Sequence, residues 1–343
     1  MVFVRGVIGR LIWVFLILFC FGAQNAQAES TFEIHFLDVG QADAAIVICN
    51  GEVLMIDGGN AADSSMVYAY LTKVLGLEYI DAIVATHPHE DHIGGLSAAL
   101  NACDVGIIYS PVEHYDSKAF LSLTKYAGLQ GKELYVPEVV ESFALGEAEV
   151  QFLSPAREYD AENNNSIVLR IQYGETAFLF MGDAEREAEL DLLDSEFDLS
   201  ATLLKVGHHG SDTSTSYVFL REVMPEYAVI SVGENNAYEH PAESVLSRLE
   251  DAGTVIYRTD QYGTIICCSD GKKIFFQTER GGVAGEAEQE STDAIYIGNR
   301  NSKKLHFNWC SSVDDMKESN KVEISDRDAA IAAGYVPCKR CTP

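Results

Sequence analysis

Short apolar runs alternate with amphipathic stretches along most of the chain. Residues 31–39 alternate apolar and polar positions as a half-buried strand does, and residues 44–49 and 53–56 flank the turn-forming pair Asn50-Gly51. Residues 64–75 carry apolar positions at helical spacing. Further strands are predicted at residues 82–85, 106–109, 150–153, 166–173, 176–181, 203–206, 228–231, 254–257, 264–268 and 274–276, and further helices after residue 95, at 184–193, from 217, and at 241–251 with Pro241 in the first position. The pattern predicts an α/β fold with two sheets and outer helices.

The first 28 residues have the composition of a secretory signal peptide. Arg5 and Arg10 precede the apolar run 11–21, which is too short to span a bilayer, and Ala26-Gln27-Ala28 follows as a cleavage site. We therefore expect a secreted protein from which residues 1–28 are removed. A retained membrane anchor is the alternative.

Acidic residues dominate the composition. The 343 residues include 24 Lys and Arg against 52 Asp and Glu, which gives a net charge of −28. Such a charge repels polyanions at long range and argues against a nucleic-acid partner. The argument is not decisive, because the Debye length at physiological salt is about 8 Å and a bound metal can dominate the potential inside a cleft.

The densest chemistry lies in the loop Thr86–Gly95, between the strand 82–85 and the following helix. Three imidazoles and a carboxylate fall within six residues, at His87, His89, Asp91 and His92. Side chains at the carboxyl end of a strand can converge, and this set supplies the nitrogen and oxygen ligands that Zn²⁺, Mn²⁺ or Fe prefers. The loop therefore predicts a metal site; surface histidines are the alternative.

Four further motifs follow in a fixed order around this loop, namely Phe36-Leu37-Asp38-Val39-Gly40-Gln41-Ala42-Asp43-Ala44, Leu54-Met55-Ile56-Asp57-Gly58-Gly59, Phe180-Met181-Gly182-Asp183-Ala184 and Lys205-Val206-Gly207-His208-His209-Gly210-Ser211. Together with the His-x-His-x-Asp-His loop they resemble the metallo-β-lactamase superfamily. Within it, residues 32–278 look most like the extracellular hydrolase domain of the competence-type DNA-uptake family. The resemblance implies an αββα sandwich over residues 29–279, with one or two metals at the edge of the sheets.

The resemblance also implies a role for each ligand. His87 and His89 correspond to the ligands of one metal, Asp91 and His92 to those of a second, and Asp183 to the carboxylate that bridges them. Asp183 also suits a helix N-cap, which is compatible with ligation. The late histidine ligand is His208 or His209, and related hydrolases favour His209, with His208 facing the substrate.

One departure from the wider superfamily concerns the first metal. Where many members have another histidine, this chain has Asn163-Asn164-Asn165-Ser166, and the competence-type subgroup also has Asn there. An amide oxygen is a weak, hard ligand, so Mn²⁺ or a single metal becomes as plausible as two Zn²⁺ ions. We expect Asn165 to support the site, and Asp38 and Asp57 to orient imidazoles, unless these two are turn residues.

The expected mechanism uses a metal-bound hydroxide, with Asp91, Asp183, His208 and His240 as the catalytic residues. Ser211, Thr213 and Ser214 precede a helical run, where hydroxyls and free backbone N–H groups suit phosphate oxygens, and plain helix capping is the alternative. Asn236 belongs to a second polar loop, whose His240 is placed to protonate a leaving group. We therefore expect a phosphodiesterase acting on DNA; the alternatives are a hydrolase of a small ester, lactone, thioester or β-lactam, and a non-catalytic DNA-binding protein.

Composition changes after a Gly/Glu-rich linker, residues 280–293. Residues 294–343 carry eight Lys and Arg against six Asp and Glu. His306-x₃-Cys310 and Cys338-x₂-Cys341 bracket a short helix predicted at 325–333, which is the paired spacing of a structural Cys₃His zinc site. A disulfide among the three cysteines is the alternative.

The end of the chain has a second resemblance. Residues 329–334 and Tyr335-Val336-Pro337-Cys338-Lys339-Arg340-Cys341 are similar to the metal-binding domain of the Ada DNA-repair family, with His306 in place of the methyl-accepting cysteine. We therefore expect a zinc-binding module that helps to hold DNA and does not transfer methyl groups. The four cysteines outside this module, in or near predicted strands, can pair or stay buried as thiols: Cys49, Cys103, Cys267 and Cys268.

Overall fold

The computed structural model describes residues 31–281, 296–307, 313, 316–324, 330–331 and 333–338. The predicted signal peptide, most of the linker, Cys310 and Cys341 lie outside these residues, as does most of the helix predicted at 325–333. Within the described residues, no helix is long and apolar enough to cross a lipid bilayer.

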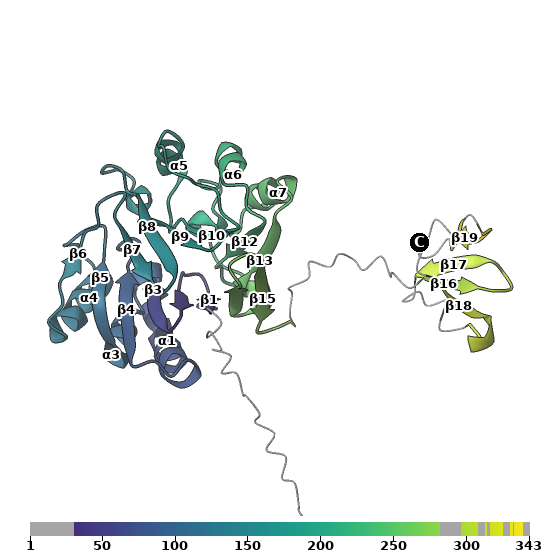
Figure 1. The fold of residues 1–343 in the computed structure, drawn as a ribbon, viewed down its shortest axis with the longest axis horizontal. Helices are drawn as coiled ribbons and strands as arrows, with labels where there is room; N and C mark the ends of the chain where they lie inside the picture. Colours follow the sequence, from purple (N-terminus) through teal and green to yellow (C-terminus); the bar gives the residue numbers. More distant parts are fainter. Residues whose placement is uncertain are drawn as a thin grey trace, which may run out of the picture.

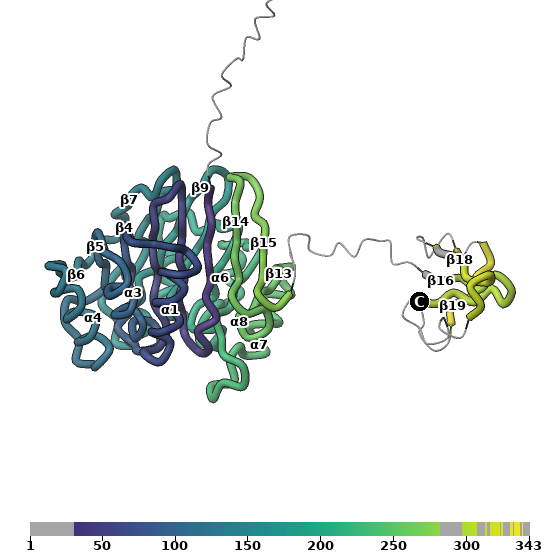
Figure 2. The backbone as a smooth tube through the Cα atoms, turned by 90° about the horizontal axis from the view of Figure 1, so that it is seen from below, coloured from purple at the N-terminus to yellow at the C-terminus, as the bar shows by residue number. Residues whose placement is uncertain are grey.

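The first sheet has eight strands in the order β15-β14-β1-β2-β3-β4-β5-β6. The strands from β3 to β6 run parallel, and the other pairs are antiparallel. β1 lies beside β14 although more than 220 residues separate them, and Figure 2 shows the purple strand against the green one. The bounds are β1 Phe32–Phe36, β2 Ala45–Cys49, β3 Glu52–Ile56, β4 Tyr79–Val84, β5 Asp104–Tyr109, β6 Leu134–Tyr135, β14 Ile265–Ser269 and β15 Ile274–Thr278.

The second sheet has seven strands in the order β13-β12-β11-β10-β9-β8-β7. The strands from β10 to β13 are parallel, and those from β7 to β10 are antiparallel. The bounds are β7 Ser142–Leu145, β8 Ala148–Ser154, β9 Val168–Tyr173, β10 Thr176–Phe180, β11 Leu203–Lys205, β12 Tyr227–Ile230 and β13 Val255–Arg258. Each sheet thus contains a parallel part whose strands end at one common edge.

The two sheets pack face to face and helices cover their outer faces, which makes four layers. Between the sheets, Phe32 stacks on Phe178 and Phe36 on Phe180, with ring centroids 4.8 and 5.8 Å apart. Helices α1 (Ser64–Ala69), α3 (Leu96–Ala102) and α4 (Lys118–Leu129) cover the first sheet, and α5 (Arg186–Leu193), α6 (Tyr217–Val223) and α7 (Glu243–Asp251) cover the second (Figure 1). Because both faces are covered, β2 is one continuous apolar run. The expected αββα sandwich is confirmed.

Three details differ from the sequence prediction. The helix predicted at 64–75 is α1 followed by a π-helical stretch at Tyr70–Val74. The helix predicted to begin with Pro241 begins at Glu243 with Ala242 as its N-cap, so Pro241 precedes it. Helix α4 was not predicted, although its buried Ala119, Phe120, Leu123 and Ala127 have helical spacing.

A four-stranded sheet, β18-β16-β17-β19, forms where the sequence predicts the C-terminal module. Its strands are β16 Tyr296–Asn299, β17 Lys304–Phe307, β18 Lys321–Ile324 and β19 Val336–Pro337. His306 and Cys338 are both buried, and the Cys338 N–H bonds the carbonyl of Leu305, the neighbour of His306. Two of the four predicted zinc ligands are therefore close along the backbone, and the zinc site itself stays a prediction. Outside this sheet, Cys49, Cys103, Cys267 and Cys268 are free thiols.

Candidate metal centre

The predicted ligands lie on loops that follow parallel strands of both sheets. His87 and His89 follow β4, and the short helix α2 (Glu90–Ile93) carries Asp91 and His92. Asp183 follows β10, and the 3₁₀ turn Gly207–Gly210 after β11 carries His208 and His209. All of them therefore meet at the edge where strands of the two sheets end.

Close backbone contacts fix these loops. A Cβ on Gly95, just after α2, would lie 2.0 Å from the carbonyl oxygen of Gly58, so only glycine permits the turn to pack on the loop after β3. Gly182 has a φ of +52°, and a Cβ there would lie 3.0 Å from Ser166 and 3.1 Å from Thr86. The residue before Asp183 must therefore be small and tolerate the left-handed region.

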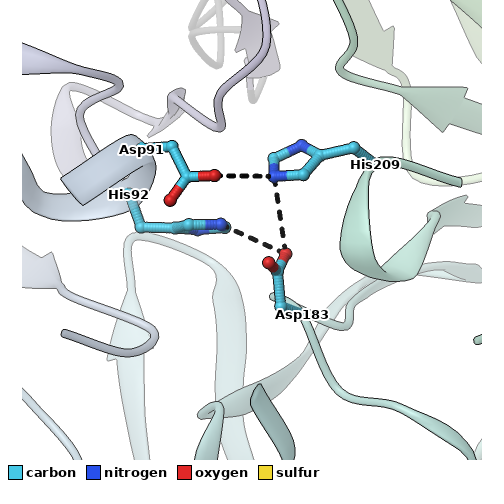
Figure 3. A group of neighbouring side chains, drawn as sticks. All are labelled: Asp91, His92, Asp183 and His209. Carbon is cyan, nitrogen blue, oxygen red and sulfur yellow. Dashed lines mark ion pairs between the residues drawn. The ribbon is translucent and has the colours of Figure 1, made fainter. Parts of the chain in front are cut away.

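Four side chains form the tightest cluster. One potential metal-ligand atom from each of Asp91, His92, Asp183 and His209 lies within 4.8 Å of all the others. Figure 3 shows the first two pointing from α2 toward the other two. His92 Nε2 is 3.1 Å from Asp183 Oδ1, and His209 Nε2 is 3.4 Å from Asp91 Oδ2. The structure thus places His209, rather than His208, in this cluster.

Asp183 lies between two groups of imidazoles. Its Oδ1 faces His92 and His209, at 3.1 and 3.7 Å from their Nε2 atoms. Its Oδ2 faces His87 and His208, at 3.7 and 3.8 Å. This is the arrangement in which one carboxylate can serve two cation sites. On the Oδ2 side, His89 Nδ1 lies 3.0 Å from His87 Nε2.

The outer nitrogen of each imidazole has its own partner. His92 Nδ1 lies 2.7 Å from Asp57 Oδ2, His209 Nδ1 lies 3.0 Å from the Ser231 carbonyl, and His89 Nε2 lies 2.9 Å from Glu162 Oε2. Because these oxygens can only accept, each outer nitrogen carries the proton and donates it. The inner nitrogens are then unprotonated in the neutral rings and available as ligands.

Three atoms at the centre lack a hydrogen bond. His92 Nε2, His209 Nε2 and Asp183 Oδ1 are buried and have no hydrogen-bond partner among the described residues. Buried polar atoms are otherwise almost always paired, so three that converge point to a missing common partner. Two imidazole nitrogens and carboxylate oxygens are a suitable ligand set for a divalent cation such as Zn²⁺ or Mn²⁺.

The pKa values of the histidines and of Asp183 in and beside the cluster are shifted in different directions. Burial disfavours charge on His209, but the carboxylates of Asp183 and Asp43 outweigh burial and raise the pKa of His209 to about 10. Likewise, despite burial, Asp183 and Asp57 raise the pKa of His92, and the imidazoles hold the pKa of Asp183 well below its usual range. Burial and the neighbouring His92 lower the pKa of His87. Without a cation, protonated rings balance the carboxylates, and a bound cation would take the place of those protons.

The two late histidines adopt an uncommon backbone conformation. His208 and His209 have φ values of 49° and 52°, both in the left-handed region. Consecutive non-glycine residues there are strained, and such strain is typical of functional sites. The conformation directs His209 into the buried cluster and leaves His208 partly exposed, with its Nδ1 atom 3.1 Å from Glu185 Oε1.

A pocket of about 560 Å³ opens over the cluster. Its floor includes Asp91, Asp183 and His209, and its walls carry amide and imidazole groups. His240 lies in one wall, where burial and the nearby His208 lower its pKa. The residues that line it are Gln41, Asn60, His89, Glu90, Asp91, Asn163, Asp183, His208, His209, Tyr238 and His240.

Two of the expected supporting residues lie elsewhere. The carboxylate of Asp38 pairs with Arg280 and contacts no histidine within the described chain, so the expectation that it orients an imidazole is wrong. Asn165 bonds the backbone of Tyr159 at both ends of its amide. Its neighbour Asn163 reaches the site instead, with Nδ2 3.4 Å from His208 Nε2. Asp57, in contrast, lies directly behind His92.

The Ser/Thr loop does not offer the anion site that the sequence suggests. Ser214 is fully buried and donates to the Gly207 carbonyl. The buried carboxylate of Glu189 accepts the backbone N–H groups of Thr215 and Ser216, directly before α6. The protein's own carboxylate thus occupies the place expected for phosphate.

The remaining predicted substrate contacts also have partners within the protein. Thr213 donates to Glu185 Oε1, and its Oγ1 lies 3.0 Å from Ser211 Oγ. Asn236 folds its own loop through four hydrogen bonds, two of them to the backbone of His240. These hydrogen bonds hold the two loops beside the site, and a substrate contact by Ser211, Thr213 or Asn236 stays a prediction.

Sequence reasoning missed a buried ion pair beneath the cluster. Lys205 Nζ lies 2.7 Å from Asp43 Oδ2, and Asp43 Oδ1 lies 3.2 Å from His209 Nδ1. Although burial raises it, the pKa of Asp43 is held below its usual range by Lys205 and His209. Both residues belong to motifs visible in the sequence, where the available signal was the lysine that ends the apolar strand β11. Glu162, the partner of His89, had no comparable signal.

Comparisons with known proteins agree with this geometry. Residues 37–234 match the family model described as the metallo-beta-lactamase superfamily. Over 274 residues the chain is 30% identical to ComE operon protein 3 of Bacillus subtilis (strain 168), which covers 74% of this chain and 34% of that protein. Competence protein ComA of Neisseria gonorrhoeae is 30% identical over 257 residues, covering 74% of this chain and 35% of that protein.

The chain thus spans about a third of the length of these two relatives. Among solved structures, the metallo-beta-lactamase fold protein YhfI from Bacillus subtilis aligns with a TM-score of 0.49 and 13% identity. That alignment covers 69% of this chain and 100% of the other.

Proposed function

The chain belongs to the metallo-β-lactamase superfamily, and from that membership we propose that it is a metal-dependent phosphodiesterase that cleaves DNA. The observation that carries the proposal is the convergence of Asp91, His92, Asp183 and His209 below an open pocket. A divalent cation held there, Zn²⁺ or Mn²⁺, would supply a Lewis acid and lower the pKa of a bound water. His87, His89 and the Oδ2 atom of Asp183 would hold a second cation, with Asn163 where a third imidazole is absent.

The lining of the pocket favours direct attack by water. Among the described residues that line it there is no Ser, Thr or Cys, so the walls supply no aliphatic hydroxyl or thiol as a nucleophile. Asn163 and His208 stand beside Asp183 and can donate hydrogen bonds to the oxygens of a phosphodiester. His240, kept neutral by its surroundings, can accept a proton from the attacking water and then, as the imidazolium, pass it to the leaving oxygen.

The relatives support DNA as the substrate. The name of one of them, Competence protein ComA, refers to competence, which suggests a role connected with DNA. We propose further that residues 1–28 direct the chain out of the cell, and that residues 294–343 form a zinc-binding module that holds DNA near the site. Residues 294–343 are mildly basic, whereas the whole chain is acidic. This contrast supports a role for residues 294–343 in holding DNA.

The test is strand cleavage by the purified chain. With Mn²⁺ or Zn²⁺ added, we expect it to nick plasmid DNA and cleave oligonucleotides, and a chelator to abolish both activities. Asp183→Asn should lower kcat by several orders of magnitude with little effect on folding, because the side chain lies between both imidazole groups but outside the apolar core.

Asp38→Asn is the matched control, since it removes a nearby carboxylate that pairs with Arg280 and contacts no member of the cluster. This variant should keep wild-type turnover. Turnover of small esters or lactones without cleavage of any phosphodiester would contradict the proposal. Unchanged kcat in Asp183→Asn would contradict the assignment of the cluster.

A further inference from the structure

An exposed aromatic ring stands at the rim of the pocket, and the metal chemistry makes no use of it. The side chain of Tyr238 is 70% exposed, yet it lines the same pocket as Asp183 and His208. A single exposed aromatic side chain is ordinary on a protein surface. Its position at the mouth of a polar pocket, and the way it is held there, call for a physical reason.

The loop that carries the ring is held rigidly. The Asn236 side chain accepts the N–H groups of Tyr238 and His240 and donates to the carbonyls of Gly233 and His240. Gln41, from the first sheet's side of the pocket, accepts the N–H of Gly233 at 3.1 Å. A ring fixed before binding loses little conformational freedom when a ligand arrives, which favours affinity.

A row of rings leads from the cluster to this rim. The ring centroids of Tyr238 and His240 are 5.7 Å apart with an angle of 28° between their planes, an offset stack. The His240 ring is again 5.7 Å from that of His208, whose Nε2 lies 3.8 Å from Asp183 Oδ2. The flat ring of Tyr238 therefore lies beyond His208 and His240, beside the place where the reacting group of a substrate at Asp183 would lie.

Charge makes such a surface necessary for a nucleic-acid substrate. The chain carries a net charge of −28, and Glu234 and Glu239 lie in the same loop as the ring. The chain therefore repels a phosphate backbone at long range, and short-range contacts must supply the affinity. Stacking on an aromatic side chain is such a contact, because every base has a flat face, and it changes affinity by roughly 5- to 100-fold per base.

We propose that Tyr238, backed by His240, is a stacking platform for an unpaired nucleobase next to the bond that is cleaved. The inference rests on the proposed phosphodiesterase function and names its substrate class, which is single-stranded DNA. A base inside a duplex is already stacked and paired, and must be extruded at a cost before it can meet the ring.

The experiment compares two single strands of equal length on the metal-loaded full chain. One is oligothymidylate, and the other has the same phosphodiester backbone with tetrahydrofuran in place of every nucleoside. Tyr238→Leu should raise KM for oligothymidylate about tenfold, within the range expected for one stacked base. It should leave kcat nearly unchanged and KM for the abasic strand unaltered. Tyr238→Phe keeps the flat ring and should behave like wild type.

A rise in KM for both strands would overturn the platform, because it would mark a loop distortion, and so would no rise for either. If the wild-type chain cleaves neither strand nor plasmid DNA, the proposed function fails, and fluorescence anisotropy of the labelled strands decides the platform separately. Cleavage of plasmid DNA alone overturns single-stranded DNA as the substrate class. Base-dependent binding that is lost in Tyr238→Leu then supports the platform. Equal binding of the two strands overturns it.

Discussion

Three groups behind the ring hold the imidazole of His209 in place. Its Nδ1 faces the Ser231 carbonyl and the carboxylate of Asp43, which itself pairs with Lys205. Lys205 and Asp43 are only 3% and 5% exposed. Burial removes water from both charges, so each charge is stabilised by its pairing with the other. Lys205 therefore reaches the cluster through Asp43, without contacting a donor atom of the candidate metal site.

Lys205→Met tests this indirect role. Loss of the ammonium leaves a buried unpaired carboxylate, and we expect a loss of about 3–5 kcal/mol in the free energy of unfolding. The affinity for Mn²⁺ or Zn²⁺ should fall about 10- to 100-fold, as it does when the outer partner of a ligating histidine is removed. Denaturant unfolding and calorimetric metal titration measure the two effects.

The double variant Lys205→Met with Asp43→Asn separates stability from positioning. It removes both charges, so stability should largely return while the metal affinity stays low. Lys272→Met, on the exposed turn between β14 and β15, controls for the loss of a lysine. Wild-type metal affinity in the double variant would argue against a role for the pair in placing His209.

At this scale the sequence predicted the residues that share a short motif. The spacing of His87, His89, Asp91 and His92 within one loop was sufficient to predict a site, and the order of the later motifs pointed to Asp183 and to His208 or His209. The structure brings Asp183 and His209 to Asp91 and His92. The residues that support the ligands from behind were harder to predict. Lys205 and Asp43 are 162 residues apart and meet only where the two sheets pack together. The same holds for Glu162, which lies 73 residues from His89.

Strand β1 contains a buried histidine that the site does not use. His35 is 4% exposed, and its Nδ1 and Nε2 atoms lie 2.8 Å from the Tyr70 hydroxyl and 3.2 Å from Glu33 Oε2. Since the carboxylate can only accept, Nε2 carries the proton and Nδ1 accepts from Tyr70. Burial lowers the pKa of His35 despite the nearby Glu33, so the folded strand holds the neutral ring.

This lowered pKa predicts a pH-dependent stability. The unfolded chain takes up a proton near the ordinary value of 6.5, whereas the folded chain does so at lower pH. The contribution of neutral His35 is therefore present above pH 6.5 and is lost as the pH falls toward the folded pKa, by at most about 1.4 kcal/mol per pH unit. Denaturant unfolding from pH 7 to pH 5 should show this slope.

His35→Gln keeps one acceptor and one donor without a titrating ring, and its slope over the same range should be shallower than that of wild type. His114→Gln removes an exposed histidine and serves as the control. Parallel slopes for wild type and His35→Gln would contradict the assignment of a neutral buried ring.

Elements with both faces covered were the easiest to predict. Strands such as β2 and β10 are unbroken apolar runs bounded by turn residues, so their ends were predicted within about one residue. Helix α6 begins at Tyr217, as predicted. The N–H groups before it were expected to be free, whereas Glu189 of α5 accepts those of Thr215 and Ser216 once the two helices pack side by side. The position predicted for Pro241 was also wrong. Its ring suits the first turn of a helix, but α7 begins two residues later, at Glu243.

The whole chain combines a strongly acidic sandwich with a mildly basic C-terminal segment. His306 is 6% exposed, and its Nδ1 atom has no hydrogen-bond partner among the described residues. A buried, unpaired ring nitrogen beside a strand that leads to Cys338 fits the predicted Cys₃His zinc site. A segment of about 50 residues buries little apolar surface, so metal binding would supply much of its folding free energy.

Metal content of the full chain tests this site. Cys338→Ser should lower the tightly bound zinc by one equivalent per chain, measured by elemental analysis after dialysis, and leave cleavage of short oligonucleotides unchanged. Cys268→Ser removes a thiol from the large sandwich and should retain all of the zinc. Equal zinc content in wild type and Cys338→Ser would exclude the site.

Fold class and layer order followed from sequence because they depend on repeated apolar patterns and on the order of several motifs. The contrast between the acidic sandwich and the mildly basic residues 294–343 was also visible in the sequence. The substrate-facing surface was not, since Tyr238 and Gln41 come together only when loops from opposite sheets close over Asp183.

The cluster takes its donors from both halves of the sandwich. Asp91 and His92 follow a strand of the first sheet, whereas Asp183 and His209 follow strands of the second. A cation bound by all four is a cross-link between the layers, and at a thousandfold excess over its Kd it would add about 4.1 kcal/mol to the folded state. Metal starvation would then loosen this edge before any strand melts, and we expect its first signs to be faster amide exchange and proteolytic nicking along the seam between the sheets.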